Sequence, residues 1–303
     1  MKKKVLIGGG SGLVGKRLHQ LLEAKNYEVW VLSRSSTGKK NAIKWDVKNQ
    51  KLDSPAIEGF EYVINLTGAG IVDEPWTEER KKEIIDSRVK SSELLAKAFS
   101  QNSKKPISFV SASAVGFYGF VTGEHIFTET DAAGTDFLAE TCELWEQSTD
   151  SIKKLGIPTA LIRIGIVLDK NGGALKEMAK PVKLFAAAAL GTGKQYLPWV
   201  HVDDLCNLFI HAVENKLAGP YNAGAPNQVN NKTFTKVLAK VLKRPFFLPN
   251  VPPFVMKLIL GTRALLVLEG SRVSPEKIQK TGFEFEFTDL EKALKRLTQL
   301  ATH

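Results

Sequence analysis

Residues 5–16 read Val-Leu-Ile-Gly-Gly-Gly-Ser-Gly-Leu-Val-Gly-Lys. Gly9, Gly12 and Gly15 form the pattern GxxGxxG, and Gly10 followed by the last two also satisfies GxGxxG. In such a turn one glycine permits a tight exit from a strand, one lets the backbone approach a pyrophosphate, and one lets the next helix pack on the sheet. The spacing therefore predicts a strand, a phosphate-binding turn and a helix in direct succession.

The residues on either side of the glycines fit this context. The run Val5-Leu6-Ile7 is typical of a buried strand, and residues 13–25 carry the helical spacing of apolar side chains. The first amides of that helix, at Leu13, Val14 and Gly15, would point their N–H groups and the positive end of the helix dipole at a phosphate. We therefore expect a dinucleotide to bind at this turn.

Short strand-like runs alternate with longer helical patterns through the first half of the chain. The strand-like runs are Lys4–Ile7, Glu28–Leu32, Tyr62–Asn65, Ile107–Val110 and Thr159–Ile162. The helical patterns between them are Leu13–Lys25, Thr77–Phe99 and Phe137–Leu155. This alternation predicts an α/β fold of the Rossmann type, with a doubly wound parallel sheet covered by helices on both faces.

After about residue 166 the pattern loosens into short helices separated by glycine and proline clusters. The helices expected there are Asp203–Val213, Asn231–Leu242, Pro275–Lys280 and Thr288–Leu297. We expect a dinucleotide-binding domain over residues 1–165, and over residues 166–303 mainly a smaller α/β substrate lobe packed on the strand ends. The longest apolar stretch, residues 254–268, contains two charges and a glycine, which favours a helix packed in this lobe or in a dimer interface over a membrane span.

The end of the second predicted strand indicates which cofactor would bind. An NAD site presents Asp or Glu about twenty residues past the glycines, where it grips the ribose hydroxyls. Here the strand is followed by Ser33-Arg34-Ser35-Ser36, with Lys39 and Lys40 just beyond. Because a guanidinium matches a phosphate bidentately, Ser33 and Arg34 predict binding of a 2′-phosphate and hence NADP(H). A solvated surface arginine is the alternative.

The overall composition excludes several classes of function. The 303-residue chain carries a net charge of +10, but the charge is spread along the sequence and no nucleic-acid-binding motif accompanies it. Its two cysteines, Cys142 and Cys206, lie far apart without ligand-like spacing, so we expect no metal site or disulfide. The apolar run after Lys2, Lys3 and Lys4 is too short for an export signal. We expect a cytoplasmic protein with no nucleic-acid or membrane partner.

Further stretches, taken with the glycine turn and Arg34, resemble the extended short-chain dehydrogenase/reductases. More narrowly, nearly the whole chain is similar to the atypical branch of epimerase family proteins, whose function is largely unassigned. The stretches that carry the resemblance include Asn65-Leu66-Thr67-Gly68-Ala69, Ser87-Arg88-Val89, Ser111-Ala112-Ser113-Ala114-Val115-Gly116, Trp145-Glu146, Arg163-Ile164-Gly165, Trp199-Val200-His201-Val202-Asp203-Asp204 and Asn222-Ala223-Gly224-Ala225-Pro226.

The resemblance implies further cofactor-binding residues. Asp46, at the end of the third strand, would lie near the adenine, although a turn residue is an equal alternative. Leu66, Thr67 and Gly68 correspond to the loop that lines the adenosine ribose. Ser111 and Ser113 fall on the strand that carries the active-site hydroxyl, with Ser113 the better match. The segment from Gly165 to Val167 would approach the nicotinamide.

The superfamily's usual catalytic pair is missing. Its Tyr-x-x-x-Lys places both side chains on one helix face, and the lysine lowers the pKa of the tyrosine that acts as acid or base. The residues four places after the five tyrosines of this chain are Val31, Leu66, Thr122, Val200 and Ala225. Alignment on Glu146 instead puts Leu138 and Cys142 at the Tyr and Lys positions, as is known of the atypical branch.

Two other residues are candidates for the missing proton chemistry. Tyr118, five residues after Ser113, would act from its loop or would serve only as an aromatic wall of the site. His201 titrates near neutral pH, or else packs one lobe against the other.

Arg88 and Arg163 would meet an anionic substrate, or equally would be buried partners of carboxylates.

These observations leave two hypotheses for function. The first is an NADP(H)-dependent oxidoreductase or epimerase-like enzyme of unknown small-molecule substrate, with carbonyl reduction as a candidate reaction and Ser113, Tyr118 and His201 as its catalytic residues. The second is a catalytically idle NADP(H)-binding sensor or interaction protein. Either would be a monomer or a homodimer.

The residues after the second strand predict a preference for NADP(H) over NAD(H). Arg34→Ala should weaken NADP(H) binding selectively by roughly 1.5–3 kcal/mol, the usual contribution of hydrogen bonds to a charged group. That is on the order of a ten- to hundredfold change in dissociation constant. Calorimetric titration of both cofactors measures it, and equal affinities of the unmutated protein for NADPH and NADH would contradict the assignment.

Overall fold

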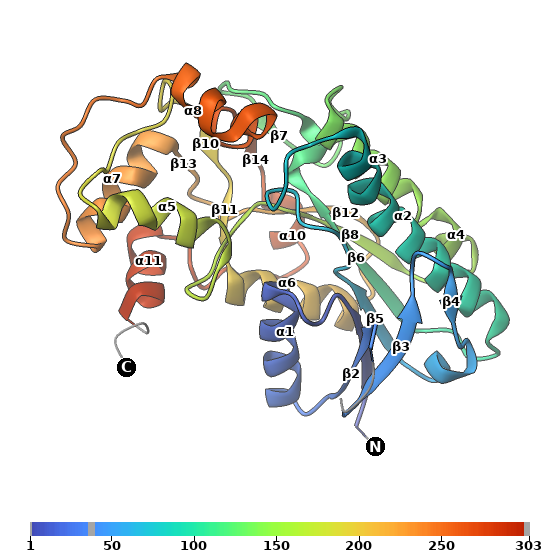
Figure 1. Cartoon of the computed structure of the whole chain (residues 1–303). Coiled ribbons are helices and arrows are strands. Elements are labelled where there is room, and N and C mark those ends of the chain that lie inside the picture. Colours follow the sequence, from blue (N-terminus) through green and yellow to red (C-terminus); the bar gives the residue numbers. More distant parts are fainter. Residues whose placement is uncertain (1, 36–39, 300–303) are drawn as a thin grey trace.

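The computed structural model describes residues 2–35 and 40–299. Within these residues an eight-stranded sheet forms the centre of the molecule, in the order β12-β8-β6-β5-β1-β2-β3-β4 (Figure 1). Its strands are β1 (Lys4–Gly8), β2 (Glu28–Ser33), β3 (Ala42–Asp46), β4 (Lys51–Leu52), β5 (Tyr62–Asn65), β6 (Ser108–Ala114), β8 (Thr159–Ile164) and β12 (Gly219–Ala223). All neighbouring strands are parallel except β3 and β4, which confirms the predicted Rossmann-type sheet.

The strand order reverses at β1, which lies between β2 and β5. Gly8, the last residue of β1, pairs with Leu32 on one side and with Asn65 on the other. In open α/β sheets the crevice at such a reversal, beyond the carboxyl ends of the strands, is where ligands bind. The glycine turn and the loop after β5 therefore both start at this point of the sheet.

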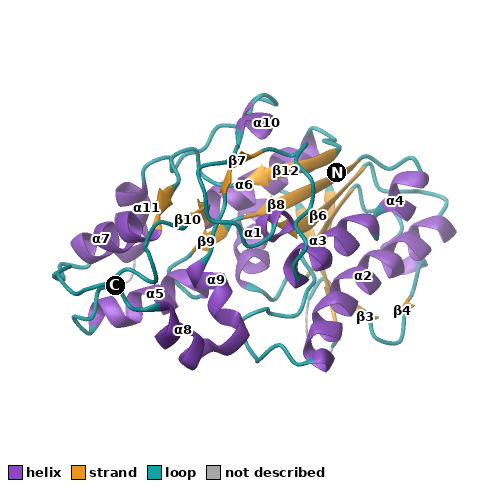
Figure 2. Cartoon of the chain, turned by 90° about the horizontal axis from the view of Figure 1, so that it is seen from above, coloured by secondary structure: helices purple, strands orange, loops and turns teal. Residues whose placement is uncertain are grey.

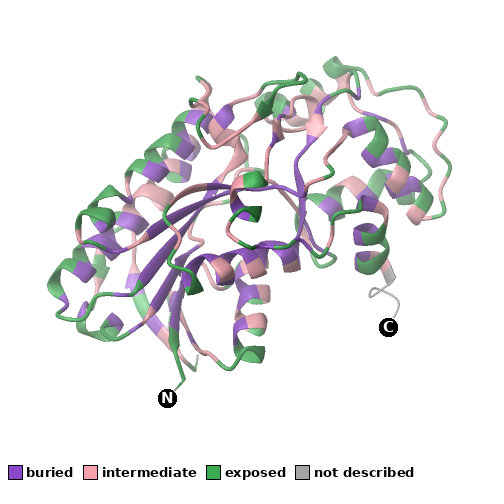
Figure 3. Ribbon diagram, turned by 180° about the vertical axis from the view of Figure 1, so that it is seen from behind, coloured by how far each residue is buried: buried purple, intermediate pink, exposed green. Residues whose placement is uncertain are grey.

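Helices cover both faces of the sheet, as Figures 1 and 2 show. One face carries α1 (Leu13–Ala24) and α6 (Val202–Glu214), and the other carries α2 (Glu78–Gln101), α3 (Phe137–Gln147) and α4 (Asp150–Lys154). Because side chains alternate along a strand, Val5 and Ile7 join the apolar cluster under α1 and α6, whereas Leu6 joins the cluster under α2. The central strands β1, β5, β6 and β8 are buried on both faces (Figure 3).

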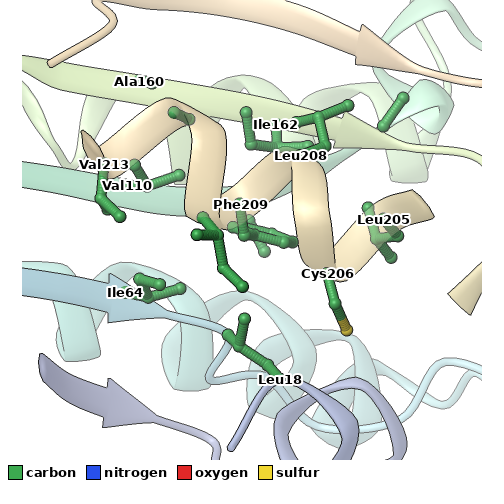
Figure 4. Close-up of a cluster of buried hydrophobic side chains, with 14 of the residues drawn as sticks. Leu18, Ile64, Val110, Ala160, Ile162, Leu205, Cys206, Leu208, Phe209 and Val213 are labelled. Atoms are coloured by element: carbon green, nitrogen blue, oxygen red, sulfur yellow. The ribbon is translucent and has the colours of Figure 1, made fainter. Parts of the chain in front are cut away.

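The α6 helix supplies much of the larger apolar cluster. Leu205, Leu208, Phe209 and Val213 project from α6 among side chains of β5, β6 and β8, and Leu18 approaches from α1 (Figure 4). Full burial of each such side chain stabilises the fold by about 1.5–3 kcal/mol relative to exposure. This packing fixes α1, and with it the glycine turn, against the sheet.

The remaining elements form a smaller lobe beyond the strand ends. It contains the strand pairs β9–β11, β10–β13 and β7–β14 and has its own apolar core around Trp199 and Phe234. The strands are β7 (Ile126–Phe127), β9 (Ile166–Leu168), β10 (Tyr196–Leu197), β11 (Trp199–His201), β13 (Val229–Asn230) and β14 (Arg272–Val273). Its helices are α5 (Gly173–Lys183), α7 (Asn231–Val241), α8 (Pro253–Leu260), α9 (Leu265–Leu268) and α11 (Leu290–Gln299). The short α10 (Glu276–Gln279) instead lies beside β12, and its Ile278 belongs to the core under α6.

Two details of the path differ from the expectation. The chain returns to the main body after residue 166, because α6 packs on the sheet and β12 pairs with β8.

The helix expected over Phe137–Leu155 is interrupted between α3 and α4. There Ser148 Oγ donates to the Trp145 carbonyl and Thr149 Oγ1 to the Glu146 carbonyl, and such side-chain bonds compete with helix continuation.

The apolar stretch over residues 254–268 also differs from its expected packing. It forms α8 and α9, but α8 buries none of its side chains, and Phe254, Leu258 and Ile259 are 70%, 84% and 66% exposed. The prediction that this helix packs within the lobe is therefore wrong for α8, and the dimer-interface alternative stays a prediction. Across the described residues, no helix combines the length and apolarity that crossing a membrane requires.

Candidate functional site

Two glycines of the turn after β1 are required by close backbone packing. Gly9 has φ of +75°, and a Cβ on it would lie 2.7 Å from the Leu66 carbonyl oxygen. A Cβ on Gly15 would lie 2.5 Å from the Gly9 carbonyl oxygen and 2.7 Å from the Gly10 Cα. Because neither glycine carries a side chain, α1 can pack against the turn, and the turn can pack against the loop after β5.

Gly12 is different, because the space beside its Cα is open. A Cβ there would meet only the Gly9 carbonyl oxygen, at 3.4 Å, and the backbone has ordinary extended angles. Gly12 is the N-cap of α1 and supplies no side-chain hydrogen bond to it. The amides of Leu13, Val14 and Gly15 therefore begin the helix without a side-chain cap from residue 12.

The loop after β5 lies directly beside the glycine turn. The Leu66 amide donates to the Gly8 carbonyl at 2.9 Å, and the Thr67 amide donates to Asn65 Oδ1 at 3.2 Å. A Cβ on Gly68 would lie 2.9 Å from Arg88 Cζ, so the Arg88 guanidinium rests against this loop. The structure thus brings the predicted residues 66–68 next to the predicted phosphate turn.

The predicted adenosine-side residues lie at the ends of β2 and β3. Arg34 is exposed, and Ser33 Oγ donates to the Ser35 carbonyl at 2.7 Å. The Asp46 carboxylate accepts hydrogen bonds from the Asn49 side-chain and backbone nitrogens at 2.7 and 3.0 Å, which lower its pKa. Asp46 thus stabilises the turn after β3, which is the role of a turn residue that the sequence left as the alternative. Lys39 lies outside the described residues.

The residues expected near the nicotinamide lie at the ends of β6 and β8. A Cβ on Gly165 would lie 1.9 Å from the Pro198 carbonyl oxygen, so this glycine permits β9 to cross towards β11. Val167 lies in β9 and packs against the core under α6. Ser111 is buried, and its hydroxyl donates to the Ala112 carbonyl at 3.0 Å.

Ser113 belongs to a buried ion-pair network. Its Oγ donates to Glu146 Oε1 at 2.7 Å. Arg163, the register partner of Ser113 in β8, donates from Nε to Glu146 Oε1 at 2.8 Å and from a terminal nitrogen to Oε2 at 2.9 Å. Burial opposes the charge on Arg163, but the hydrogen bonds and negative charge of Glu146 outweigh it and raise the pKa of Arg163.

Tyr118 joins the other end of the same network. The phenol donates to Asn222 Oδ1 at 2.7 Å and accepts from Arg163 at 2.9 Å. It is only 2% exposed, and burial raises its pKa although Arg163 and Asn222 oppose the rise. The structure therefore brings Ser113 and Tyr118 together through Glu146 and Arg163, with both hydroxyls already hydrogen-bonded.

His201 lies apart from these two hydroxyls. It is the N-cap of α6, where its Nδ1 accepts from the Asp203 amide at 3.1 Å, and its ring stacks on Phe287 at 3.7 Å between centroids. Burial lowers its pKa to about 4, so the imidazole is neutral at physiological pH. Its contacts join α6 to the segment before α11, as the packing alternative describes.

The two arginines singled out in the sequence have different surroundings. Arg163 is the buried partner of a carboxylate. Arg88 donates to the Ile84 carbonyl and lies over the Trp145 ring at 4.9 Å, and it forms no ion pair within residues 2–35 and 40–299. Burial lowers its pKa to about 10, which still leaves it charged. Groups of His, Cys, Asp and Glu suited to holding a metal are absent from the described part of the chain.

Sequence reasoning gave no role to Glu146 or Asn222, which complete the network. Each was a polar residue inside an otherwise apolar pattern: Glu146 follows Trp145 on α3, and Asn222 follows Tyr221 in β12. A buried polar residue needs a partner, so this pattern was the available signal. It does not say which partner, because Glu146 and Asn222 come from separate segments.

Comparison with known proteins identifies the family. Residues 5–144 match the model of the NAD dependent epimerase/dehydratase family, and residues 251–297 match a domain of unknown function. The epimerase family protein YfhF of Bacillus subtilis is 37% identical over 97% of both chains. The chain belongs to the epimerase family. Human epimerase family protein SDR39U1 is 32% identical to this chain, over 97% of this chain and 99% of the human protein.

Solved structures agree with this assignment. The crystal structure of human epimerase family protein SDR39U1 with NADPH matches this epimerase family protein with a TM-score of 0.87, at 30% identity over 98% of this chain and 99% of that chain. The Thermus thermophilus UDP-glucose 4-epimerase, in complex with NAD, has a TM-score of 0.77 at 20% identity over 99% of both chains, which shows the fold alone. The chain is thus an epimerase family protein with an NAD(P)-binding Rossmann-like fold.

Gly12 and Gly15 should respond differently to substitution. Gly12→Val should leave the epimerase family protein folded but abolish the thermal stabilisation expected from NADP(H), since a side chain would fill the open space above the turn. Gly15→Ala should lower the unfolding midpoint without any cofactor, because its Cβ would meet the Gly9 carbonyl oxygen at 2.5 Å. Thermal unfolding with and without NADPH measures both, and a Gly12→Val protein still stabilised by NADPH would contradict the phosphate site.

The buried network should dominate the effect of substitutions in α3. Glu146→Gln should lower the free energy of unfolding by about 3–5 kcal/mol, because it leaves the buried Arg163 without its carboxylate. Glu143→Gln, on the exposed side of the same helix, is the matched control and should change stability by less than about 0.5 kcal/mol. Urea denaturation measures both. Equal effects would show that the Glu146–Arg163 pair contributes no stability.

Proposed function

We propose that this chain binds NADP(H) at the carboxyl edge of the sheet, with the pyrophosphate on the turn formed by residues 9–15. The observation that carries the proposal is the open space at Gly12 above the uncapped start of α1. A phosphate there would accept hydrogen bonds from the amides of Leu13 and Val14 and lie at the positive end of the helix dipole.

The choice of NADP(H) rests on Arg34. Its exposed guanidinium follows β2, at the end where the ribose of a bound adenosine lies in this fold. With no carboxylate in residues 33–36, a 2′-phosphate would meet a cation and no negative charge. NADPH in the human relative's crystal structure supports this choice.

Arg88 would supply a second cation to the same site. It rests against Gly68 beside the glycine turn, and its charge acts on the neighbouring Cys142 thiol. Cys142 stands where the superfamily resemblance places a lysine, so Arg88 brings a positive charge to that neighbourhood from α2. We propose that Arg88 binds a phosphate of the cofactor or an anionic group of the substrate.

The bound cofactor would supply hydride transfer, and we propose reduction of a small carbonyl compound as its use. A tyrosine whose pKa burial raises stays protonated at neutral pH, so Tyr118 could give a proton more readily than take one. Ser113 would hydrogen-bond the substrate oxygen. Both residues would first exchange their present partners, Asn222 and Glu146, for the substrate.

NADP(H) binding without turnover is the second candidate function. It is favoured by the network itself, in which the Ser113 hydroxyl and the Tyr118 phenol already have buried partners. Exposure of a hydroxyl to a substrate would break a charge-assisted hydrogen bond, at a cost of about 1.5–3 kcal/mol. The output would then be a cofactor-dependent interaction with a partner.

A screen of aldehydes, ketones and sugar-nucleotide-like carbonyl compounds separates the two functions. Any turnover should appear as NADPH oxidation and fall roughly a hundredfold or more in Ser113→Ala and Tyr118→Phe, the range expected for loss of acid–base catalysis. Unfolding midpoints of both variants control for loss of the folded protein. Full rates in both variants would contradict the proposed catalytic residues, and tight NADPH binding without any turnover would favour the binding protein.

A further inference from the structure

A cavity of about 350 Å³ lies where residues of α1, α6 and α11 meet the loop after β9. Its walls come from α1, the loop after β9, the start of α6 and the last turn of α11. Its size falls within the range of small-molecule sites. The charged and polar residues that line it are Arg17, Asp169, Lys170, His201, Asp203 and Arg296.

The most informative of these residues is His201. It is 2% exposed, and its Nδ1 accepts the Asp203 amide hydrogen, so the neutral ring carries its proton on Nε2. That Nε2 is buried and has no hydrogen-bond partner anywhere in the described parts of the chain. An unsatisfied buried donor destabilises the protein, so a ligand that accepts this hydrogen bond would recover the lost free energy.

The charges around His201 indicate what kind of ligand fits. Both carboxylates of the cavity are engaged: Asp203 pairs with Arg17 at 2.5 Å, and the buried Asp169 accepts the Asn171 amide at 2.5 Å. Lys170 and Arg296 form no ion pair with any residue that the structure describes. The unengaged groups are therefore an ammonium, a guanidinium and an imidazole N–H, and all of them are donors.

We propose that this cavity binds a small oxyanion, the phosphate or carboxylate group of a metabolite. Lys170 and Arg296 would bind it from the rim, and His201 Nε2 would donate a hydrogen bond from the floor. The three cations and two carboxylates of the lining leave one net positive charge, which a monoanion neutralises. No residue of the glycine turn lines the cavity, so the proposed oxyanion would not occupy the pyrophosphate position on that turn.

Calorimetric titration of the full chain with inorganic phosphate tests the proposal, and citrate in a second arm tests a carboxylate source. Sodium chloride keeps the ionic strength constant, because exposed charges are screened by salt. The titrations are run on the Gly12→Val protein and on unmutated protein saturated with NADPH, so that phosphate cannot report the glycine turn. Binding in both preparations is the expected result, whichever of the two oxyanions binds more tightly.

The variants remove the rim charges and the floor donor. Lys170→Gln with Arg296→Gln should weaken oxyanion binding about 10- to 100-fold, the usual worth of charged hydrogen bonds. Lys176→Gln with Lys292→Gln removes two exposed charges from the neighbouring helices outside the cavity and should leave affinity unchanged. His201→Asn keeps an oxygen acceptor for the N-cap of α6 but loses the Nε2 donor, and it should also weaken binding.

Three results would overturn the proposal. The first is no binding of phosphate or citrate beyond that of chloride at the same ionic strength. The second is equal loss of affinity in the cavity variants and in the control pair, which would indicate a diffuse effect of net charge. The third is oxyanion binding that disappears in Gly12→Val and in NADPH-saturated protein alike, which would assign it to the glycine turn. Failure of NADPH binding itself would be seen separately, in the Arg34→Ala and Gly12→Val titrations.

Discussion

A buried positive charge on Arg163 constrains the half of the sheet beyond β5. A guanidinium inside a sheet face is costly unless a carboxylate neutralises it and its donors are used, so α3 must present Glu146 to it. A further N–H of Arg163 donates to the Tyr118 phenol, and the phenol donates to Asn222 in β12. One charge thereby connects β6, α3, β8 and β12, and it sets which polar side chains are available at the strand ends.

Different interactions therefore form the two sides of the candidate site. On the cofactor side, backbone geometry dominates: glycines permit close approaches, and the start of α1 offers amides that need no side chain. On the substrate side, side chains dominate, and they are tied into a network with few free donors. A cofactor can bind to the first without disturbing the fold, whereas a substrate reaching Ser113 or Tyr118 must compete with Glu146 or Asn222.

This difference also explains what could be predicted from the sequence. The glycine turn is a local pattern, so its strand, turn and helix follow from residues 4–25, and the parallel sheet follows from strand–helix alternation. The network was not predictable in the same way, because Ser113, Glu146, Arg163 and Asn222 lie on four elements and meet only when the sheet has formed. The prediction that α8 is packed was wrong for a related reason. An apolar run indicates a helix but does not say whether another surface covers that helix.

The missing Tyr–Lys pair and the burial of Tyr118 are two aspects of one packing arrangement. The alignment on Glu146 puts Leu138 and Cys142 at the positions of the pair. Both are buried on α3, and burial raises the pKa of the Cys142 thiol to about 12, so the thiol stays neutral. A Cβ on Gly116 would lie 3.5 Å from Leu138 Cβ and 3.8 Å from Cys142 Sγ, so the segment leading to Tyr118 packs directly on them. A lysine at position 142 would be longer than the cysteine and would press on the segment that carries Tyr118 to Arg163.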